Sequence, residues 1–401
     1  MKPNILIVSH SLALGGIERS LIELLRALDE ERLDVELLLL SHTGPLMAEL
    51  PPRCVLLPED PRLASFLRPV KQVLFGGHPL LAAARLMAKW QISRDFPLSS
   101  HSEDSVVFAT LQKYWDKLLP LLPRQEKEYD AAISFQWPHH YVARRVKAKY
   151  KAAWVHTDFR AAALNTAGDL AVWREFNDIA AVSRGVLEGF ADVHPALTDR
   201  CFVFENLLSP AAVRAKADAF VPEDMPCPGN AFRLLTVGRF CYPKAFDQAL
   251  RICGELLALG LNLVWYAIGF GSEAQPLRRL IEEMGLEDRF ILLGQRENPY
   301  PYMKVCDLYV QPSRYEGKAV TVMEALTLGK PVVVTNFPTA AAQVEDGADA
   351  RIVPMDPPAA AREIAALLAD PAEMRRLADN AAKRDYSGYD QLEGLYERLC
   401  V

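Results

Sequence analysis

The sequence predicts an α/β protein built from two doubly wound parallel sheets, one in each half of the chain. Short apolar runs alternate with longer amphipathic stretches in both halves, which is the pattern of repeated strand–helix units. Loops rich in glycine and polar residues follow these runs, as at the carboxyl edge of a parallel sheet. The chain has 401 residues. Because a single core rarely grows beyond about 250–300 residues, two domains are expected.

Composition places the chain among ordinary globular proteins. Half of the residues are hydrophobic, 24% are charged, and the net charge of −6 argues against a nucleic-acid-binding protein. Seven scattered cysteines without a C-x-x-C pair indicate a reducing compartment, with neither a disulfide framework nor a zinc site. The first apolar run is too short for a signal peptide, and no apolar run reaches about 18 residues. We therefore expect a cytoplasmic protein.

The N-terminal domain is expected over residues 1–206 and begins with a strand at Asn4–Val8. Gly15 and Gly16 follow, and a helix then runs from about Ile17 to Asp29. Glycines between a strand and a helix let the backbone approach a ligand, and the helix N-terminus favours an anion. A simple tight turn explains the pair equally well. Further strands are expected at 35–40, 129–135, 152–156, 179–183 and 201–206.

Residues 61–123 have a looser pattern, in which prolines and glycines separate short helical pieces. Leu80–Trp90 and Val107–Leu122 are amphipathic, with basic residues among the apolar ones. Two interpretations stay open: a membrane-facing or ligand-docking segment, or an ordinary helical layer that covers the sheet.

Histidines follow two of the predicted strands. His139 and His140 belong to the loop 136–140, and His156 ends the strand 152–156. A lone histidine at a strand end is more often a hydrogen-bonded structural residue than a functional one. Nothing further in the sequence supports a role for His139 or His140.

The second half repeats the strand–helix pattern after a change of character. Residues 207–230 contain four prolines and no periodic apolar pattern, so they are interpreted as an interdomain linker. A C-terminal domain is expected at 231–385, and 386–401 as a terminal helix. Within this domain, strands are expected at 233–237, 263–268, 290–293, 306–310 and 331–334. Helices are expected at 246–259, 319–328, 359–368 and 374–383, and one more follows the loop 269–273 and ends at Met284.

Candidate binding residues lie in the loops of this second half. Arg239 and Lys244 share one strand-end loop and can clamp a diphosphate, the arginine in a bidentate manner and the lysine as a point charge, although two solvated cations explain them as well. Glu316 lies in a later strand-end loop, and Glu324 follows it inside the next helix. Two glutamates at this spacing also occur by chance on a solvated helix face. Further candidates for backbone approach to a nucleotide or for framing its base are Gly238, Gly269, Gly271, Asn298, Pro299, Tyr300, Gly317, Lys318 and Ala319.

Taken together, these motifs resemble the retaining glycosyltransferases of sequence family 4, which have the GT-B fold of two Rossmann-like domains with a cleft between them. The resemblance rests on P-S-x-Y-E-G…E-A-x-x-x-G-x-P-V-V from Pro312 to Val334, on G-R-x-x-x-x-K at Gly238–Lys244, on G-G-x-E-R at Gly15–Arg19 and on W-x-H-x-D at Trp154–Asp158. It covers nearly the whole chain and is weakest between Pro61 and Pro123.

The resemblance implies roles for individual residues. Arg239 and Lys244 would stabilise the leaving nucleoside diphosphate, Glu316 would contact donor-sugar hydroxyls and Glu324 would hold the ribose. His156 would approach the donor sugar, and the Gly15–Gly16 loop would lie between donor and acceptor. The final helix would cross back onto the first domain. No metal site is expected, because no D-x-D-type carboxylate cluster is present.

Two residues depart from the family pattern. Ala245 replaces the glycine that usually follows the clamp lysine, which puts close backbone approach there in doubt. Lys318 stands where many relatives have an aromatic or aliphatic residue, and its E-G-K sequence resembles a branch that builds bacterial surface polysaccharides. Lys318 is hypothesised to add charge beside the donor or an anionic acceptor. Unchanged KM values for both substrates in Lys318→Ala would exclude this.

The resemblance implies a metal-independent retaining hexosyltransferase that uses no cofactor. It would move a sugar from a nucleoside-diphosphate sugar, with UDP as the commonest base, to a saccharide or lipid-linked saccharide acceptor in surface glycan synthesis. Peripheral contact with the inner face of the membrane is compatible with residues 61–123, and no nucleic-acid partner is expected. The alternatives are a sugar-nucleotide epimerase of the same fold and a catalytically silent nucleotide-sugar-binding protein.

Overall fold

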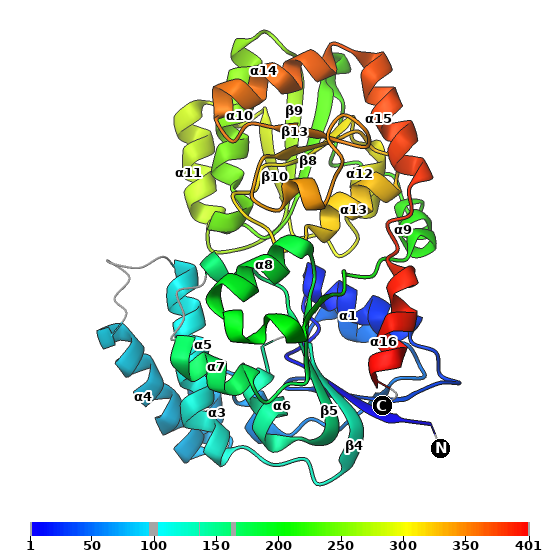
Figure 1. Ribbon diagram of the computed structural model, residues 1–401. Coiled ribbons are helices and arrows are strands. Elements are labelled where there is room, and N and C mark those ends of the chain that lie inside the picture. Colours follow the sequence, from blue (N-terminus) through cyan, green and yellow to red (C-terminus); the bar gives the residue numbers. More distant parts are fainter. Residues whose placement is uncertain (1, 96–102, 136, 162–165, 400–401) are drawn as a thin grey trace. The chain divides into compact units, whose positions relative to one another are not determined.

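A computed structural model of the chain describes residues 2–95, 103–135, 137–161 and 166–399. The chain divides into two compact units. The N-terminal unit comprises Met1–Glu205 and Tyr389–Val401, and the C-terminal unit comprises Asn206–Gly388. Each unit contains one parallel sheet with helices packed around it (Figure 1). The predicted α/β fold with two doubly wound sheets is therefore confirmed.

The sheet of the N-terminal unit has the strand order β3-β2-β1-β4-β5-β6-β7, and its neighbouring strands pair in parallel. The order reverses between β1 and β4, so the loops after these two strands flank the switch point of the sheet. The strands are β1 (Asn4–Ser9), β2 (Asp34–Leu39), β3 (Val55–Leu56), β4 (Glu128–Ser134), β5 (Lys147–Val155), β6 (Asp178–Ala181) and β7 (Cys201–Val203).

Helices from both ends of the chain surround this sheet. The backbone N–H of Asp29 donates to the Tyr396 hydroxyl (2.8 Å), and the Arg32 guanidinium lies over the Tyr396 ring, so the last helix packs within the N-terminal unit. The helices of the unit are α1 (Gly16–Ala27), α2 (Pro61–Ala64), α3 (Val70–Phe75), α4 (Pro79–Asp95), α5 (Glu103–Leu118), α6 (His139–Arg145), α7 (Thr166–Trp173), α8 (Arg184–Val193) and α16 (Leu392–Leu399).

The sheet of the C-terminal unit has the strand order β10-β9-β8-β11-β12-β13, again with parallel pairing and a reversal between β8 and β11. Its strands are β8 (Phe232–Val237), β9 (Leu263–Ile268), β10 (Phe290–Gly294), β11 (Leu308–Gln311), β12 (Val332–Thr335) and β13 (Arg351–Val353). Its helices are α9 (Pro210–Ala217), α10 (Phe246–Ala258), α11 (Ala274–Met284), α12 (Tyr300–Val305), α13 (Val320–Thr327), α14 (Pro357–Leu368) and α15 (Pro371–Lys383).

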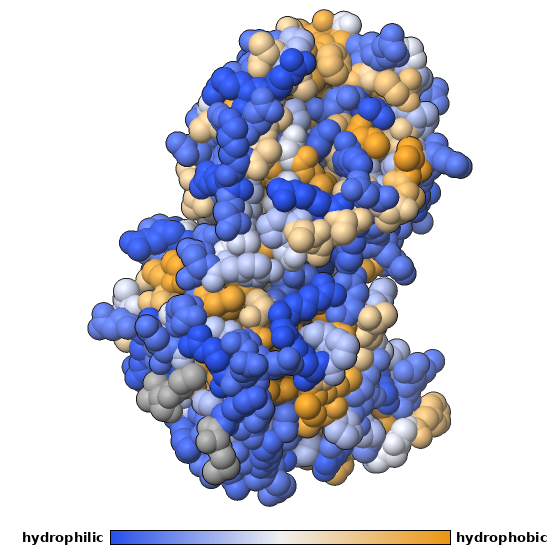
Figure 2. Space-filling model, turned by 90° about the vertical axis from the view of Figure 1, so that its right-hand side faces the viewer, coloured by the Kyte–Doolittle hydropathy of each residue, from blue (hydrophilic) through white to orange (hydrophobic). Residues whose placement is uncertain are grey.

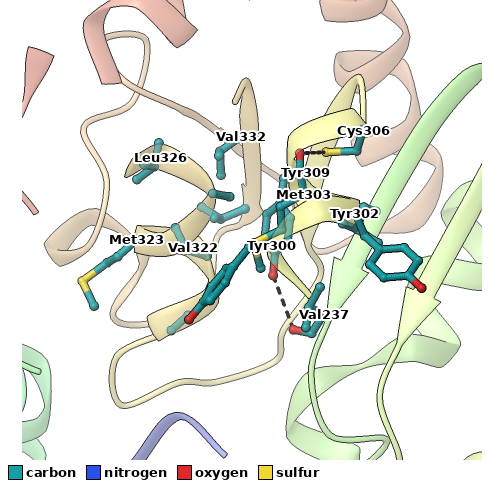
Figure 3. Close-up of a cluster of buried hydrophobic side chains, with 14 of the residues drawn as sticks. Val237, Tyr300, Tyr302, Met303, Cys306, Tyr309, Val322, Met323, Leu326 and Val332 are labelled. Atoms are coloured by element: carbon teal, nitrogen blue, oxygen red, sulfur yellow. Dashed lines mark hydrogen bonds between the residues drawn. The ribbon is translucent and has the colours of Figure 1, made fainter. Parts of the chain in front are cut away.

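Strand β9 shows why the strands of this unit are continuous apolar runs. Its residues alternate between two hydrophobic clusters: Leu263, Trp265 and Ala267 face one, and their neighbours Val264, Tyr266 and Ile268 face the other. Both faces of the sheet are therefore buried under helices, as a parallel sheet requires. Figure 3 shows the second cluster, where Tyr309 of β11 extends toward the Val237 carbonyl at the end of β8. By contrast, the surface view in Figure 2 is mostly hydrophilic, with apolar residues in separate groups.

The interpretation of residues 207–230 as a linker is corrected by the structure. Pro210–Ala217 form α9, and Leu208, Val213, Ala217 and Met225 are buried in the hydrophobic cluster around Tyr309. The stretch is thus an integral part of the C-terminal unit. Its prolines misled the prediction because one of them, Pro210, occupies the first helical position, where a missing N–H costs nothing.

Two further local differences have simple causes. The predicted loop 136–140 includes the start of α6, since this helix begins at His139 directly after Pro138, and Gln136 lies outside the described residues. Strands β3 and β13 were not predicted at all. Both are edge strands of two or three residues, too short to show a periodic pattern.

Among the described residues, no helix combines the length and the apolar character that a membrane span needs.

Candidate functional site

The switch point of the C-terminal sheet brings two of the predicted loops together. Strands β8 and β11 pair in parallel on either side of the reversal, so their following loops leave the same edge side by side. The loop after β8 contains Gly238, Arg239 and Lys244, and the loop after β11 contains Glu316. The sequence could not show that these two loops are neighbours, because about 70 residues and a helix–strand succession separate them.

Lys244 and Glu316 form an ion pair across this switch point. The Lys244 ammonium donates to both carboxylate oxygens of Glu316, at 2.6 and 2.8 Å. The two side chains are 22% and 8% exposed, so the pair is largely shielded from water. An ammonium group has three donors. Two of them bond to Glu316, and the third N–H has no partner among the residues that the structure describes, so it can bind an anion.

A chain of buried polar groups holds the Glu316 carboxylate in place. The Ser313 hydroxyl donates to Glu316 Oε1 (2.6 Å), and the Gln311 amide donates to the Ser313 hydroxyl (2.8 Å) and to Glu316 (3.4 Å). The Tyr309 hydroxyl donates to the Gln311 side-chain oxygen (3.0 Å). Burial raises the pKa of Tyr309, which keeps this hydroxyl protonated. Sequence analysis missed Tyr309, which lies inside the predicted strand 306–310, and Gln311, which directly follows it, because neither residue has a pattern that marks a role.

The backbone around Glu316 is fixed by two residues that sequence analysis also missed. The Thr339 hydroxyl donates to the Glu316 carbonyl (2.8 Å), and the Gln343 side-chain oxygen accepts the Ala319 backbone N–H (2.8 Å). Gln343 in turn donates to the Thr339 hydroxyl (3.0 Å). All of these atoms are buried, so the loop with Gly317 and Lys318 leads into α13 along a defined path. No sequence pattern marks Thr339 or Gln343, since they act on backbone far away in the chain.

Arg239 differs from Lys244 in its surroundings. Its side chain is exposed and forms no hydrogen bond or ion pair with any residue that the structure describes. The structure therefore does not draw Arg239 into the Lys244–Glu316 pair. Arg239 is therefore an exposed cation on the same loop, five residues before Lys244 in the chain.

Glu324 lies in a second buried cluster, beside the loop that follows β10. Its side chain is 1% exposed, and its Oε1 accepts the Tyr300 hydroxyl (2.8 Å). The Asn298 amide donates to the Lys216 carbonyl of the α9 segment (2.8 Å), and its oxygen accepts the Tyr300 backbone N–H (3.2 Å). Pro299 precedes α12 as its N-cap residue. The structure thus brings Asn298, Pro299, Tyr300 and Glu324 together.

Gly269 and Gly271 have a packing role that the sequence did not reveal. A Cβ atom on Gly269 would lie 1.9 Å from the Gly238 carbonyl oxygen, and one on Gly271 would lie 2.2 Å from the Phe240 carbonyl oxygen. Gly271 also has φ +155°. The loops after β8 and β9 therefore touch through their backbones, and this contact holds the Arg239–Lys244 loop in position. Contact of these glycines with a nucleotide stays a prediction.

Gly269→Ala is expected to lower the free energy of unfolding by about 2 kcal/mol or more, because the new methyl group meets rigid backbone. Gly394→Ala is the control, since a Cβ there has no atom within 4 Å. Urea unfolding of the two variants provides the measurement. Equal stability of both would show that the two loops do not pack as described.

Ala245, which stands where the family pattern has a glycine, has a backbone conformation that favours glycine. Its backbone is left-handed (φ 53°, ψ 44°) at the N-cap of α10, and the residue is fully buried. An alanine in this region costs roughly 1–2 kcal/mol relative to a glycine. The position thus has the conformation that favours glycine, and the chain adopts it with an alanine.

In the N-terminal unit, His156 lines a small pocket at the end of β5, together with Trp137, His139, Trp154 and Phe159. Burial lowers the pKa of His156 to about 4, so its imidazole is neutral near pH 7. The Phe135 carbonyl lies 2.8 Å from Nε2 and must accept a hydrogen bond, which places the ring proton on Nε2. Nδ1 is then an acceptor, and it is buried without a partner among the described residues. This atom can accept a hydrogen bond from a hydroxyl group.

The other predicted residues of this unit contact neighbouring side chains or begin a helix. His139 shares a hydrogen bond with the Ser134 hydroxyl (2.8 Å), and His140 stacks on Trp115. Gly16 begins α1, and Gly15 is its N-cap in an extended conformation. A Cβ on Gly15 would lie 2.2 Å from a carboxylate oxygen of Glu18, so Gly15 leaves room for that buried side chain.

This architecture is that of the GT-B glycosyltransferases. Anabaena HepE in complex with UDP covers 100% of both chains with a TM-score of 0.68 and 18% identity. Staphylococcus aureus TarM, in a complex with fondaparinux, α-GlcNAc-glycerol and UDP, likewise covers 100% of both chains with a TM-score of 0.70 and 12% identity. At these identities the similarity establishes the fold.

Within this fold, residues 221–384 match the family described as Glycosyl transferases group 1. This match lies within the C-terminal unit, and it agrees with the predicted family resemblance there. The matched segment contains the Lys244–Glu316 pair and the Glu324 cluster.

Curated relatives match over part of their length. The α-D-kanosaminyltransferase of Streptomyces kanamyceticus is 30% identical over 175 residues, which is 41% of this chain and 45% of that protein. The N-acetylgalactosamine-N,N'-diacetylbacillosaminyl-diphospho-undecaprenol 4-α-N-acetylgalactosaminyltransferase of Campylobacter jejuni is 28% identical over 162 residues, which is 40% of this chain and 42% of that protein. The chain thus spans less than half the length of these two relatives.

Proposed function

We propose that this chain is a retaining, metal-independent glycosyltransferase that moves a sugar from a nucleoside-diphosphate sugar to a saccharide or lipid-linked saccharide acceptor. The observation that carries the proposal is the Lys244–Glu316 pair at the switch point of the C-terminal sheet, within the segment that matches the group 1 glycosyl transferases. UDP is the first donor nucleotide to test, because HepE and TarM were solved with it. Surface glycan synthesis is the proposed setting, since the relatives include lipopolysaccharide core glycosyltransferases and an enzyme that acts on a diphospho-undecaprenol.

Each residue has a proposed task in this reaction. The third N–H of Lys244 and the free guanidinium of Arg239 bind the diphosphate, and the N-terminus of α13 adds partial positive charge. Glu316 accepts hydrogen bonds from the donor sugar, and Glu324 from the ribose. Nδ1 of His156 accepts a hydrogen bond from a sugar hydroxyl. The two cations balance the charge that the leaving diphosphate develops, which is the basis for proposing metal independence.

The chemical step balances without a side-chain base. The bond between the sugar C1 and the diphosphate oxygen breaks, and a bond from the acceptor oxygen to C1 forms on the same face of the ring. The acceptor hydroxyl gives its proton to the departing phosphate oxygen. The protein then contributes positioning and charge stabilisation, and the developing negative charge is the feature that Lys244 and Arg239 stabilise.

Thermal unfolding with UDP, GDP, ADP and TDP in the presence of EDTA tests donor binding. A ligand at 100 times its Kd adds about 2.7 kcal/mol to the free energy of unfolding. We expect one diphosphate to stabilise the protein and Lys244→Ala and Arg239→Ala to reduce that gain. Lys383→Ala and Arg279→Ala are controls, as both side chains are exposed in the same unit. No stabilisation by any of the four would contradict the proposed donor class.

Ser313→Ala is expected to lower kcat about tenfold, because the Glu316 carboxylate loses the hydroxyl that orients it. The unfolding free energy should fall by about 1 kcal/mol, since Gln311 and Lys244 still contact the carboxylate. Steady-state kinetics with the identified donor, together with urea unfolding, provide the measurement. The exposed Ser272 gives the control variant Ser272→Ala. A kcat equal to that of the parent would remove Ser313 from the positioning role.

A further inference from the structure

Helices α3 and α4 of the N-terminal unit expose large apolar side chains to solvent. Phe75 is 85% exposed, Leu80 70% and Trp90 61%, and Leu74, Leu86 and Met87 are each about half exposed. Single exposed apolar residues are normal on protein surfaces, but a contiguous group of this kind usually marks an interaction site. We call the group formed by Leu74, Phe75, Leu80, Leu86, Met87 and Trp90 the apolar face.

The spacing along α4 shows that the exposed apolar residues of this helix lie on one side of it. Leu80, Met87 and Trp90 are separated by seven and three residues, which places them on one side of a helix. On the other side, Leu81, Ala88 and Ile92 are buried, and α4 packs there against α3 and α5 (Figure 1). The helix is therefore apolar on both sides. Such helices are normally covered all round.

The charge around the apolar face is opposite to that of the whole chain. Residues 61–95 contain six lysines and arginines and one acidic residue, a net charge of +5 (6 − 1) in a chain whose net charge is −6. Four of these six cations pair with carboxylates or carbonyl groups: Arg62 with Asp60, Arg68 with Glu59, Arg94 with Asp95, and Arg85 with the Ser65 carbonyl.

Two lysines stand out within this basic segment. Lys71 and Lys89 are exposed and bond to no side chain or carbonyl that the structure describes. Lys71 lies one turn before Leu74 and Phe75 on α3, and Lys89 is adjacent to Trp90 on α4. The free positive charge thus lies at the border of the apolar face.

We propose that the apolar face docks on a lipid bilayer that carries anionic headgroups. Phe, Leu, Met and Trp side chains can enter the interface between headgroups and acyl chains, while Lys71 and Lys89 remain at the level of the phosphates. The remainder of the chain carries a net charge of −11 (−6 − 5), so an anionic surface attracts this side of the unit and repels the rest. The segment lies on the membrane and does not span it, in agreement with the absence of a spanning helix among the described residues.

Sedimentation with lipid vesicles tests this proposal and needs no sugar nucleotide, so it is independent of the proposed glycosyltransfer. The full chain is mixed with vesicles of phosphatidylcholine or of equal parts phosphatidylcholine and phosphatidylglycerol. We expect tighter binding to the anionic vesicles. Phe75→Ser/Trp90→Ser should weaken it about tenfold or more, and Lys71→Glu/Lys89→Glu should remove the preference for anionic lipid.

Matched controls come from the C-terminal unit. Val221→Ser removes a side chain that is 78% exposed, and Arg278→Glu/Arg279→Glu makes the same change of charge on exposed residues of α11. Both should bind like the parent. The proposal is overturned if the chain does not bind either vesicle, or if the apolar and lysine variants bind no more weakly than these controls. It is also overturned if the chain forms a dimer that Phe75→Ser/Trp90→Ser dissociates, because a second copy then covers the face.

Discussion

Replacing Lys244 with methionine is expected to lower kcat by about 10²–10³-fold. The substitution keeps an unbranched apolar side chain, one atom shorter than lysine, but removes the ammonium that we propose stabilises the leaving diphosphate. It also leaves the Glu316 carboxylate without its cation in a largely buried place. Because Lys244 is 22% exposed, water can partly replace it, and the unfolding free energy should fall by about 1–3 kcal/mol rather than by the larger cost of a fully buried pair.

A double variant separates the two effects. In Lys244→Met/Glu316→Gln both charges are gone, and the amide can still bond to Ser313 and Gln311. We expect this variant to regain most of the lost stability but none of the lost turnover. Lys383→Met serves as the exposed control. If the double variant recovered activity together with stability, Lys244 would be a structural residue, and the proposed clamp would be wrong.

Acid is expected to destabilise the N-terminal unit strongly, at pH values where most carboxylates are still ionised. Burial lowers the pKa of His10, His140 and His156 to about 4 each, against about 6.5 in an unfolded chain. A lowered pKa means that the unfolded state binds protons first, so stability is full above about pH 6.5 and falls as the pH decreases toward 4. At pH 5 each histidine should cost about 2 kcal/mol, or about 6 kcal/mol for the three. His139, whose pKa burial also lowers, adds to the effect.

Urea unfolding between about pH 7.5 and pH 5 measures this loss. His140 lies near Asp169, Asp116 and Arg144, but burial is the largest cause of its shift. His140→Phe keeps an aromatic ring against Trp115 and should therefore recover about 2 kcal/mol at pH 5 relative to its own stability at pH 7.5. A stability that stays constant over this range would show that these histidines are hydrated or already paired in the folded state.

The sequence was sufficient for the fold class, because both sheets bury two faces and each strand is then a continuous apolar run followed by a polar loop. It failed where local signals are weak or ambiguous. The edge strands β3 and β13 are too short for a pattern, and the prolines of 207–230 indicated a linker although Val213 and Met225 enter the core of the C-terminal unit.

The candidate site shows the same division. Motifs pointed to Lys244, Glu316, Glu324 and His156, and the roles proposed for them stay predictions. The residues that hold Glu316 were not visible, because Thr339 and Tyr309 act through contacts made only after the chain has folded. The pairing of Lys244 with Glu316 itself depends on the neighbourhood of β8 and β11, which strand order decides and sequence spacing does not.

Proton NMR of the reaction products tests whether the protein transfers a sugar with retention. The protein is incubated with the stabilising nucleotide's α-linked sugar donor, with saccharide and polyprenyl-diphosphate saccharide acceptors, and with EDTA. We predict acceptor-dependent release of the nucleoside diphosphate and a new α-linked anomeric signal, both lost in Lys244→Met. A β-linked product would contradict retention, and a new free sugar without acceptor would indicate an epimerase. No turnover despite nucleotide binding would contradict the assignment as a glycosyltransferase.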